Sequence, residues 1–188
     1  VNTQRGTNLE KLGVMIQTPE HVLAALVGCD LDNVIIELNA SELPIMDGSS
    51  KYFVEAIEKV GIVEQEAERK VYVVKEVISY LDETTGSEIT VIPSDEYCVT
   101  AMVDFGTKVL GTQNATMKSI KEFKTEIADC RTFSFLHELE SLLNNGLIKG
   151  GDLNNAIVYV DKEISAETME NLKKAFNKET ISVKSNGI

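Results

Sequence analysis

The chain has 188 residues and a formal net charge of −12 at pH 7, which suits one large domain or two small ones and disfavours contact with nucleic-acid backbones. No apolar run approaches the roughly 20 residues that a membrane-spanning helix needs. The three cysteines lie far apart without a Cys-x-x-Cys pair. We therefore expect neither a disulfide framework nor a thiolate zinc site, and a reducing cytoplasm is favoured.

Residues 3–15 show no pattern that assigns an element, and the first clear signal is a helix start. Thr18 is a good N-cap, Pro19 suits the first helical position, and Glu20 places a negative charge in the first turn. Gly28 ends this helix. The sequence therefore predicts, in order, a helix over 19–27, a short strand over 33–39, a loop over 41–50 and a helix over 51–60 that stops at Gly61.

A charged, aperiodic stretch over 64–70 is the expected linker between two parts of the chain. The second part begins with β-branched runs and turn residues, which are typical of an antiparallel meander, and continues with helical patterns around one apolar run. Its expected elements are strands over 71–80, 87–92 and 97–105, helices over 116–127 and 136–143, a buried strand over 156–160, a helix over 165–176 capped by Ser165, and a final strand over 180–184.

This order of elements predicts an α+β fold made of two small sandwich-like domains packed together, each a sheet with helices. The first domain is expected to span residues 1–66 and the second residues 67–188. No internal sequence repeat relates the two halves.

Only two histidines are available for catalysis or metal binding. His21 follows Glu20 in the first helical turn, where an imidazole can bind zinc and the neighbouring carboxylate can take a proton from metal-bound water. Taken alone, this pair is more typical of a capping-turn glutamate and a half-buried histidine. His137 lies among glutamates and indicates a solvated helix face. A catalytic zinc needs about three protein ligands, and the sequence lacks His-x-x-x-His, His-x-x-x-Asp and His-Glu-x-x-His spacings, so spacing alone predicts no complete metal site.

The run from Arg131 to Phe135 is the other candidate for chemistry. The Thr132 hydroxyl, next to aromatic side chains, can donate to a developing oxyanion in a dry pocket. The alternative is a core strand in which Phe and polar residues alternate.

Two glycine-containing stretches carry less information about function. Residues 47–50 predict a turn and an N-cap for the next helix, and residues 146–151 lack the Lys-Ser/Thr of a phosphate-binding loop.

Several longer runs are informative in combination. They are TPEHVLAAL at 18–26, DNVIIELN at 32–39, LPIMDGSS at 43–50, DCRTFSF at 129–135 and NGLIKGG at 145–151. Together they resemble the UDP-3-O-acyl-N-acetylglucosamine deacetylase family of lipid A biosynthesis, and the resemblance covers essentially the whole chain.

The resemblance implies two packed α+β domains with the site between them. It implies a zinc-dependent hydrolase that removes the acetyl group from the acetamide of UDP-3-O-acyl-N-acetylglucosamine. In that reading His21 is a zinc ligand, Glu20 is the general base that activates the zinc-bound water, and Thr132 helps hold the oxyanion. The substrate would contact further side chains: Phe105 at the sugar end, Phe133 and Phe135 at the mouth of the acyl-chain passage, and Leu139, Ile148, Ala156 and Val158 along that passage.

The resemblance also has a gap. The family takes its other two zinc ligands from a later His-x-x-x-Asp helix and a general acid from a further histidine near its C-terminus, and neither is found before Ile188. We therefore expect a piece of a longer cytoplasmic bacterial protein, truncated at both ends, which binds its metal incompletely and is inactive alone. Some relatives carry a fused dehydratase domain. The alternatives are a non-catalytic module on the same fold that binds a lipid or a partner, and a scaffold without a ligand.

Overall fold

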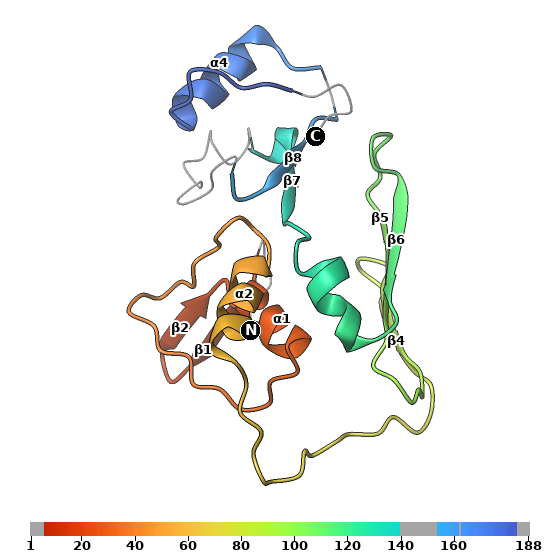
Figure 1. Ribbon diagram of the computed structural model, residues 1–188. Coiled ribbons are helices and arrows are strands. Elements are labelled where there is room, and N and C mark those ends of the chain that lie inside the picture. Colours follow the sequence, from red (N-terminus) through yellow and green to blue (C-terminus); the bar gives the residue numbers. More distant parts are fainter. Residues whose placement is uncertain (1–5, 140–153, 162, 184–188) are drawn as a thin grey trace.

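The computed structural model describes residues 6–139, 154–161 and 163–183, and it shows helices mixed with two-stranded sheets (Figure 1). The predicted α+β class is confirmed. The helical elements are α1 (Glu20–Gly28), α2 (Lys51–Val60), the 3₁₀ turn η1 (Ile120–Glu122), the π-helical turn η2 (Phe123–Ile127) and α4 (Ala166–Ala175). The strands are β1 (Asn8–Lys11), β2 (Val14–Gln17), β3 (Ile78–Asp82), β4 (Ser87–Val91), β5 (Val99–Asp104), β6 (Thr112–Met117), β7 (Phe133–Phe135) and β8 (Ile157–Tyr159).

The first part of the chain is a hairpin followed by two helices. β1 and β2 pair antiparallel, and the turn between them consists of Leu12 and Gly13, whose φ angles are both positive at 54° and 79°. A tight two-residue hairpin turn requires such angles. The helices predicted over 19–27 and 51–60 are confirmed as α1 and α2. α1 begins one residue later than expected, with Pro19 rather than Thr18 at the cap position.

The main core lies where α1 and α2 meet the η1–η2 segment. Its buried members are Ala25, Cys29, Val54, Met117, Phe123 and Ala128. These residues come from both of the expected domains, so the two parts of the chain pack against each other here. The boundary near residue 66 stays a prediction. Within this core, the aromatic ring of Phe123 lies directly against Gly28 at the end of α1.

Residues 61–77 contain no helix or strand and cross from α2 to β3 along the bottom of Figure 1. Arg69 fastens this crossing segment to the chain after α1, because its Nε donates to Asp32 Oδ2 at 2.8 Å and its Nη1 to Asp30 Oδ1 at 2.7 Å. The strand predicted over 33–39 is wrong. The strand predicted over 71–80 is confirmed only at its end, because residues 78–80 belong to β3 and residues 71–77 form no strand. Both stretches have β-forming composition, but composition alone supplies no partner strand.

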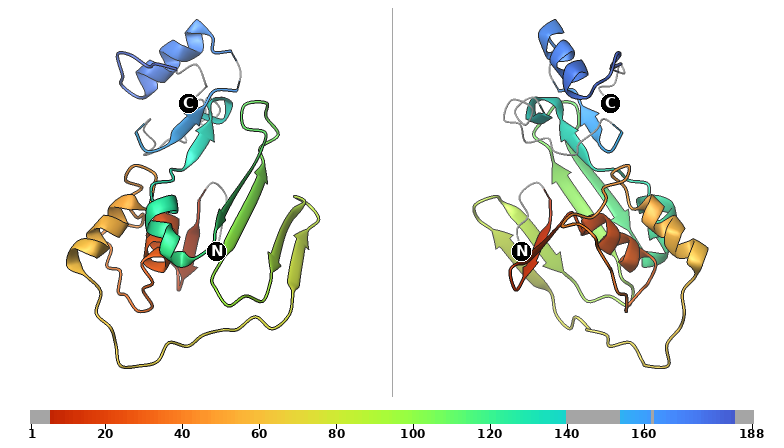
Figure 2. Two further views of the ribbon diagram at one scale, coloured as in Figure 1. Left: turned by 45° about the vertical axis from the view of Figure 1, so that its right-hand side comes forward. Right: turned by 90° about the vertical axis from the view of Figure 1, so that its left-hand side faces the viewer.

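β3–β4 and β5–β6 are separate antiparallel hairpins, which corrects the predicted single meander. In β3–β4, the pairs Ile78↔Val91 and Tyr80↔Ile89 place apolar side chains on one face. All four of these side chains are at least 42% exposed. Figure 2 shows both hairpins standing beside the helices. The helix predicted over 116–127 is confirmed only over 120–127, as a 3₁₀ turn followed by a π-helical turn. Thr112–Met117 pairs with β5 instead, and the short turns η1 and η2 follow.

The last part of the chain places β7 and β8 side by side in parallel, with Phe133↔Ile157 in register. The strand predicted over 156–160 is confirmed as β8, although its residues are half-buried rather than buried. α4 is capped as predicted, because Ser165 Oγ accepts from the Thr168 amide at 3.0 Å. Residues 136–139 are helical, and the rest of the helix predicted to 143 falls outside the described residues. Residues 180–183 form no strand.

Among the described helices, none has the length and apolar character to cross a membrane.

Gly28→Ala should destabilise the fold, because a Cβ at this position would overlap the ring of Phe123 in the buried core. Overpacking of this kind costs about 1–3 kcal/mol, measurable as a lower denaturation midpoint. Adding Phe123→Leu to Gly28→Ala should recover part of the loss, since the smaller side chain makes room. An unchanged midpoint for the single variant would contradict the close packing of α1 against η2.

Candidate active site

Glu20 and His21 form the first turn of α1 and are both partly buried. The Thr7 amide donates to Glu20 Oε2 at 3.3 Å, so the carboxylate is held against the start of the β1–β2 hairpin. The carbonyl oxygen of His21 accepts a hydrogen bond from Ser50 Oγ at 3.0 Å. The structure therefore keeps the two predicted residues together and anchors the backbone of this turn to a second segment.

That second segment is the turn Asp47-Gly48-Ser49-Ser50, here called the Asp47–Ser50 turn. Asp47 Oδ1 accepts from Ser49 Oγ at 2.7 Å and from the Ser49 amide at 3.1 Å. The Lys51 amide donates to Ser49 Oγ at 3.2 Å, so Ser49 rather than Ser50 serves the start of α2. Ser49 is fully buried. The predicted turn is confirmed. Ser50 is the N-cap residue of α2, but its side chain bonds to the His21 carbonyl and does not cap the helix.

Gly48 is where the turn meets the segment that carries Thr132. Its φ is +84°, and a Cβ there would overlap the carbonyl oxygen of Asn155 and approach Thr132 Cγ2 to 3.0 Å. Only glycine fits such a position without strain. The Thr132 amide donates to the Gly48 carbonyl at 2.7 Å, and the Thr132 carbonyl accepts from the Ile157 amide at 2.9 Å. The backbone of Thr132 is therefore fixed on both sides.

Arg131 strengthens the contact between the Asp47–Ser50 turn and Thr132, which is here called the joint. Its Nε donates to the Asp47 carbonyl at 2.6 Å, and one of its terminal nitrogens donates to the Asn154 carbonyl. Burial of Asp47 opposes ionisation of its carboxyl, but the hydrogen bonds from Ser49 and the charge of Arg131 outweigh this effect, and the pKa of Asp47 lies below its ordinary value. The turn is thus held by a carboxylate that stays ionised at neutral pH.

The three phenylalanines that the resemblance places against the substrate form one cluster. Ring centroids are 5.3 Å apart for Phe105 and Phe133, 5.9 Å for Phe133 and Phe135, and 6.4 Å for Phe105 and Phe135, all in edge-on arrangements. Tyr159 joins them from β8, and the His137 ring stacks on Phe135 at 5.6 Å. Sequence reasoning missed Tyr159, because its part depends on the register of β7 with β8, which pairs it with Phe135. It assigned His137 only to a solvated helix face.

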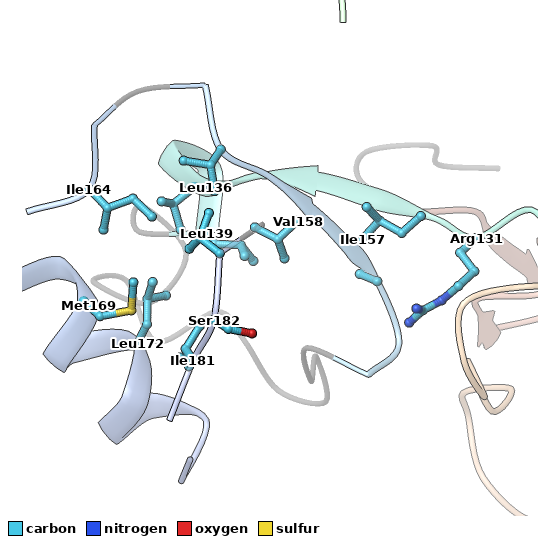
Figure 3. A pocket seen from close by; sticks show the side chains of 13 residues that line it. Arg131, Leu136, Leu139, Ile157, Val158, Ile164, Met169, Leu172, Ile181 and Ser182 are labelled. Atoms are coloured by element: carbon cyan, nitrogen blue, oxygen red, sulfur yellow. The ribbon is translucent and has the colours of Figure 1, made fainter. Parts of the chain in front are cut away.

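An apolar pocket of about 300 Å³ lies between β7–β8 and α4 (Figure 3). Leu139, Ala156 and Val158, three of the predicted passage residues, line it. Ile148, the fourth, falls outside the described residues. Met169 and Leu172 of α4 complete the lining, and their three-residue spacing was the signal that could have identified them. The described lining does not include the three phenylalanines, so the predicted substrate-binding residues divide into two groups.

The side chains that could bind a metal do not gather into one site in the described residues. No group of three or more His, Cys, Asp or Glu side chains in the described parts of the chain is arranged to hold a metal ion. His137 lies with its Nδ1 3.1 Å from Asp161 rather than near another histidine. His21 by itself does not make a zinc site, because a catalytic zinc takes about three protein ligands.

Comparison with known proteins agrees with the resemblance seen in the sequence. Residues 1–181 match the family model described as UDP-3-O-acyl N-acetylglycosamine deacetylase. A bifunctional enzyme LpxC/FabZ from Bacteroides thetaiotaomicron is 44% identical over 170 residues, which cover 90% of this chain and 37% of that protein. A UDP-3-O-acyl-N-acetylglucosamine deacetylase from Saccharophagus degradans is 41% identical over 86% of this chain and 53% of its own length. One from Syntrophotalea carbinolica is 38% identical over 87% and 53%. The chain thus spans about a third to a half of these relatives.

Acidification should loosen the Asp47–Ser50 turn. The pKa of Asp47 is lowered from its ordinary value of 3.8 on folding, so its contribution to stability is complete above that value and is lost as the pH falls through the lower, folded-state pKa. Asp47→Asn should therefore lower the free energy of unfolding by about 1 kcal/mol at neutral pH. Below pH 3.8 the variant should lose less additional stability than the unsubstituted chain.

The measurement is urea denaturation of both proteins at neutral pH and across this acid range. Asp95→Asn, at an exposed aspartate between β4 and β5, controls for the loss of one negative charge. Equal acid sensitivity of the unsubstituted chain and Asp47→Asn would contradict the role given to the Asp47 carboxylate.

Proposed function

Because this chain belongs to the UDP-3-O-acyl-N-acetylglucosamine deacetylase family, we propose that it is part of a longer protein that hydrolyses the acetamide of UDP-3-O-acyl-N-acetylglucosamine to an amine and acetate. The observation that best supports this proposal is the joint at the Asp47–Ser50 turn. Through Ser50 this turn bonds to His21, which with Glu20 would activate the water. Through Gly48 it bonds to Thr132, which would face the oxyanion.

Each of these residues has a role that suits its surroundings. Glu20 accepts a proton from the attacking water, and its half-buried carboxylate, with one oxygen facing the Thr7 amide, keeps a fixed orientation for this task. Thr132, whose backbone is fixed on both sides, directs its hydroxyl to the oxyanion that develops on the acetamide carbonyl. In the longer protein His21 is one ligand of a zinc ion, and such an ion polarises a carbonyl and lowers the pKa of bound water.

The substrate's acyl chain suits the apolar surface that continues from this joint. Arg131, immediately before Thr132, reaches the rim of the pocket lined by Leu139, Ala156 and Val158. Phe133 and Phe135, which cluster with Phe105, belong to β7, and this strand pairs with β8, which supplies Val158. We place the sugar end of the substrate near Phe105 and the acyl chain along the pocket. The protein acts in the cytoplasm in this proposal. The 188-residue chain alone is proposed to be inactive, because the described residues contain no group of three or more candidate ligands that could hold a metal ion.

A second function is favoured by the pocket alone. An apolar cavity of about 300 Å³ can hold part of a lipid or a partner's side chains whether or not chemistry follows. On this alternative the chain is a non-catalytic module on the same fold. Zinc content separates the two functions, because binding to an apolar pocket needs no metal.

The test uses the chain extended to the length of its deacetylase relatives. We expect about one zinc per chain and turnover of UDP-3-O-acyl-N-acetylglucosamine. His21→Ala should reduce the zinc content, and Glu20→Ala should keep the zinc but lower kcat by about 10²- to 10⁴-fold.

His137→Ala, the change at the other histidine of the sequence, is the matched control and should leave the zinc content unaltered. A folded extended protein without metal or turnover would overturn the deacetylase proposal and leave the binding module in its place.

A further inference from the structure

Resting on the proposed function, we propose that Arg131 is a positioning residue that sets the distance between Thr132 and the Glu20–His21 turn by clamping the Asp47–Ser50 turn. Arg131 does not touch the reacting atoms in this proposal. It acts through the backbone that carries them.

The clamp rests on the shape of the guanidinium group. Two of its nitrogens reach two carbonyl oxygens, those of Asp47 and Asn154, which belong to segments 107 residues apart in the sequence. Both acceptors are backbone atoms, so the bonds fix the path of the chain rather than the rotamer of another side chain. A planar fork with fixed donor directions can hold two such acceptors at a set separation, whereas the single ammonium group of lysine cannot.

Thr132 lies between the two clamped segments. Its amide bonds to the residue after Asp47, and its carbonyl bonds to the Ile157 amide shortly after Asn154. At Gly48 the two clamped segments and Thr132 are in close contact, because Thr132 Cγ2 and the Asn155 carbonyl lie against the glycine and neither can move closer to the turn. The position of Thr132 therefore follows the geometry of the Arg131 fork.

Ser50, at the other end of the turn, connects the clamped segments to α1. Ser50, which is 7% exposed, donates its hydroxyl to the His21 carbonyl at 3.0 Å and its amide to the Ala128 carbonyl at 3.1 Å. Only Ser49 separates Gly48 from Ser50, and its buried hydroxyl is bonded within the turn. The route from Thr132 to His21 thus has two hydrogen bonds and three residues of a tightly bonded turn.

A displacement of about 1 Å between catalytic groups can cost about 100-fold in rate. Arg131→Lys keeps the charge but removes the fork. In the extended protein it should lower kcat by about 10- to 100-fold, with zinc content unchanged and KM altered less than kcat. Ser50→Ala should also lower kcat, because it frees the helix end of the same route, and Ser50→Thr should restore part of the activity.

Arg69→Lys is the matched control. Arg69 also uses two nitrogens to join distant segments, through Asp30 and Asp32, but it lies on the exposed crossing segment. Its substitution should leave kcat unchanged. Equal kcat values for Arg131→Lys and the unsubstituted protein would overturn the positioning role, and so would an equal loss in Arg69→Lys, which would indicate general destabilisation.

A second readout needs no activity. In the 188-residue chain, Arg131→Lys should speed amide hydrogen exchange at Thr132 and Ile157 by at least about tenfold and leave exchange in α2 unaltered. Unchanged exchange at these two amides would overturn the clamp. An inactive unsubstituted extended protein would count against the proposed deacetylase function instead, and the exchange result would still decide whether Arg131 holds the joint.

Discussion

The close approach at Gly48 is the constraint on which the candidate site depends. Here the turn before α2, the segment before β7 and the chain leading into β8 come together at a separation that a Cβ would prevent. Because both backbone bonds of Thr132 are made at or beside this point, the threonine is positioned by main-chain atoms rather than by packing of its side chain. Backbone-positioned groups suit catalysis because they need little reorganisation during the reaction.

α1 is held at both of its ends by contacts of this kind. Its first turn bonds to Ser50 through the His21 carbonyl, and its last residue, Gly28, admits the ring of Phe123 into the core. Between these ends, Ala25 faces the same core. The helix therefore cannot slide along its axis without breaking one contact or the other. These two contacts fix α1, and with it the Glu20–His21 pair in its first turn, relative to the core.

Sequence patterns predicted the elements that depend on local signals and missed those that depend on partners. α2 follows from apolar periodicity that stops at a glycine, and α1 and α4 follow from their capping and terminating residues. The hairpin β1–β2 has Leu12 at positive φ, a position where Asn or Gly would have signalled a turn. The stretches 33–39 and 71–77 look like strands but find no partner, and 112–117, rich in polar residues, finds one in β5.

The site shows the same limit. Glu20, His21 and Thr132 were identified by resemblance, since their spacing alone favoured structural roles. The joint between them was not visible in the sequence, because Arg131 and Asp47 lie 84 residues apart and meet only in the fold.

The exposed faces of the two hairpins have a thermodynamic consequence. The accessible surface is 14634 Å², against roughly 8,900 Å² expected for a compact monomer of 20.7 kDa. Unfolding therefore exposes less new apolar surface than in a compact protein of this length, for which the heat-capacity change is roughly 2.3–2.8 kcal/mol/K. The heat-capacity change of this chain should lie below that range. Its stability then varies less steeply with temperature, and the curve of free energy against temperature is broad and shallow.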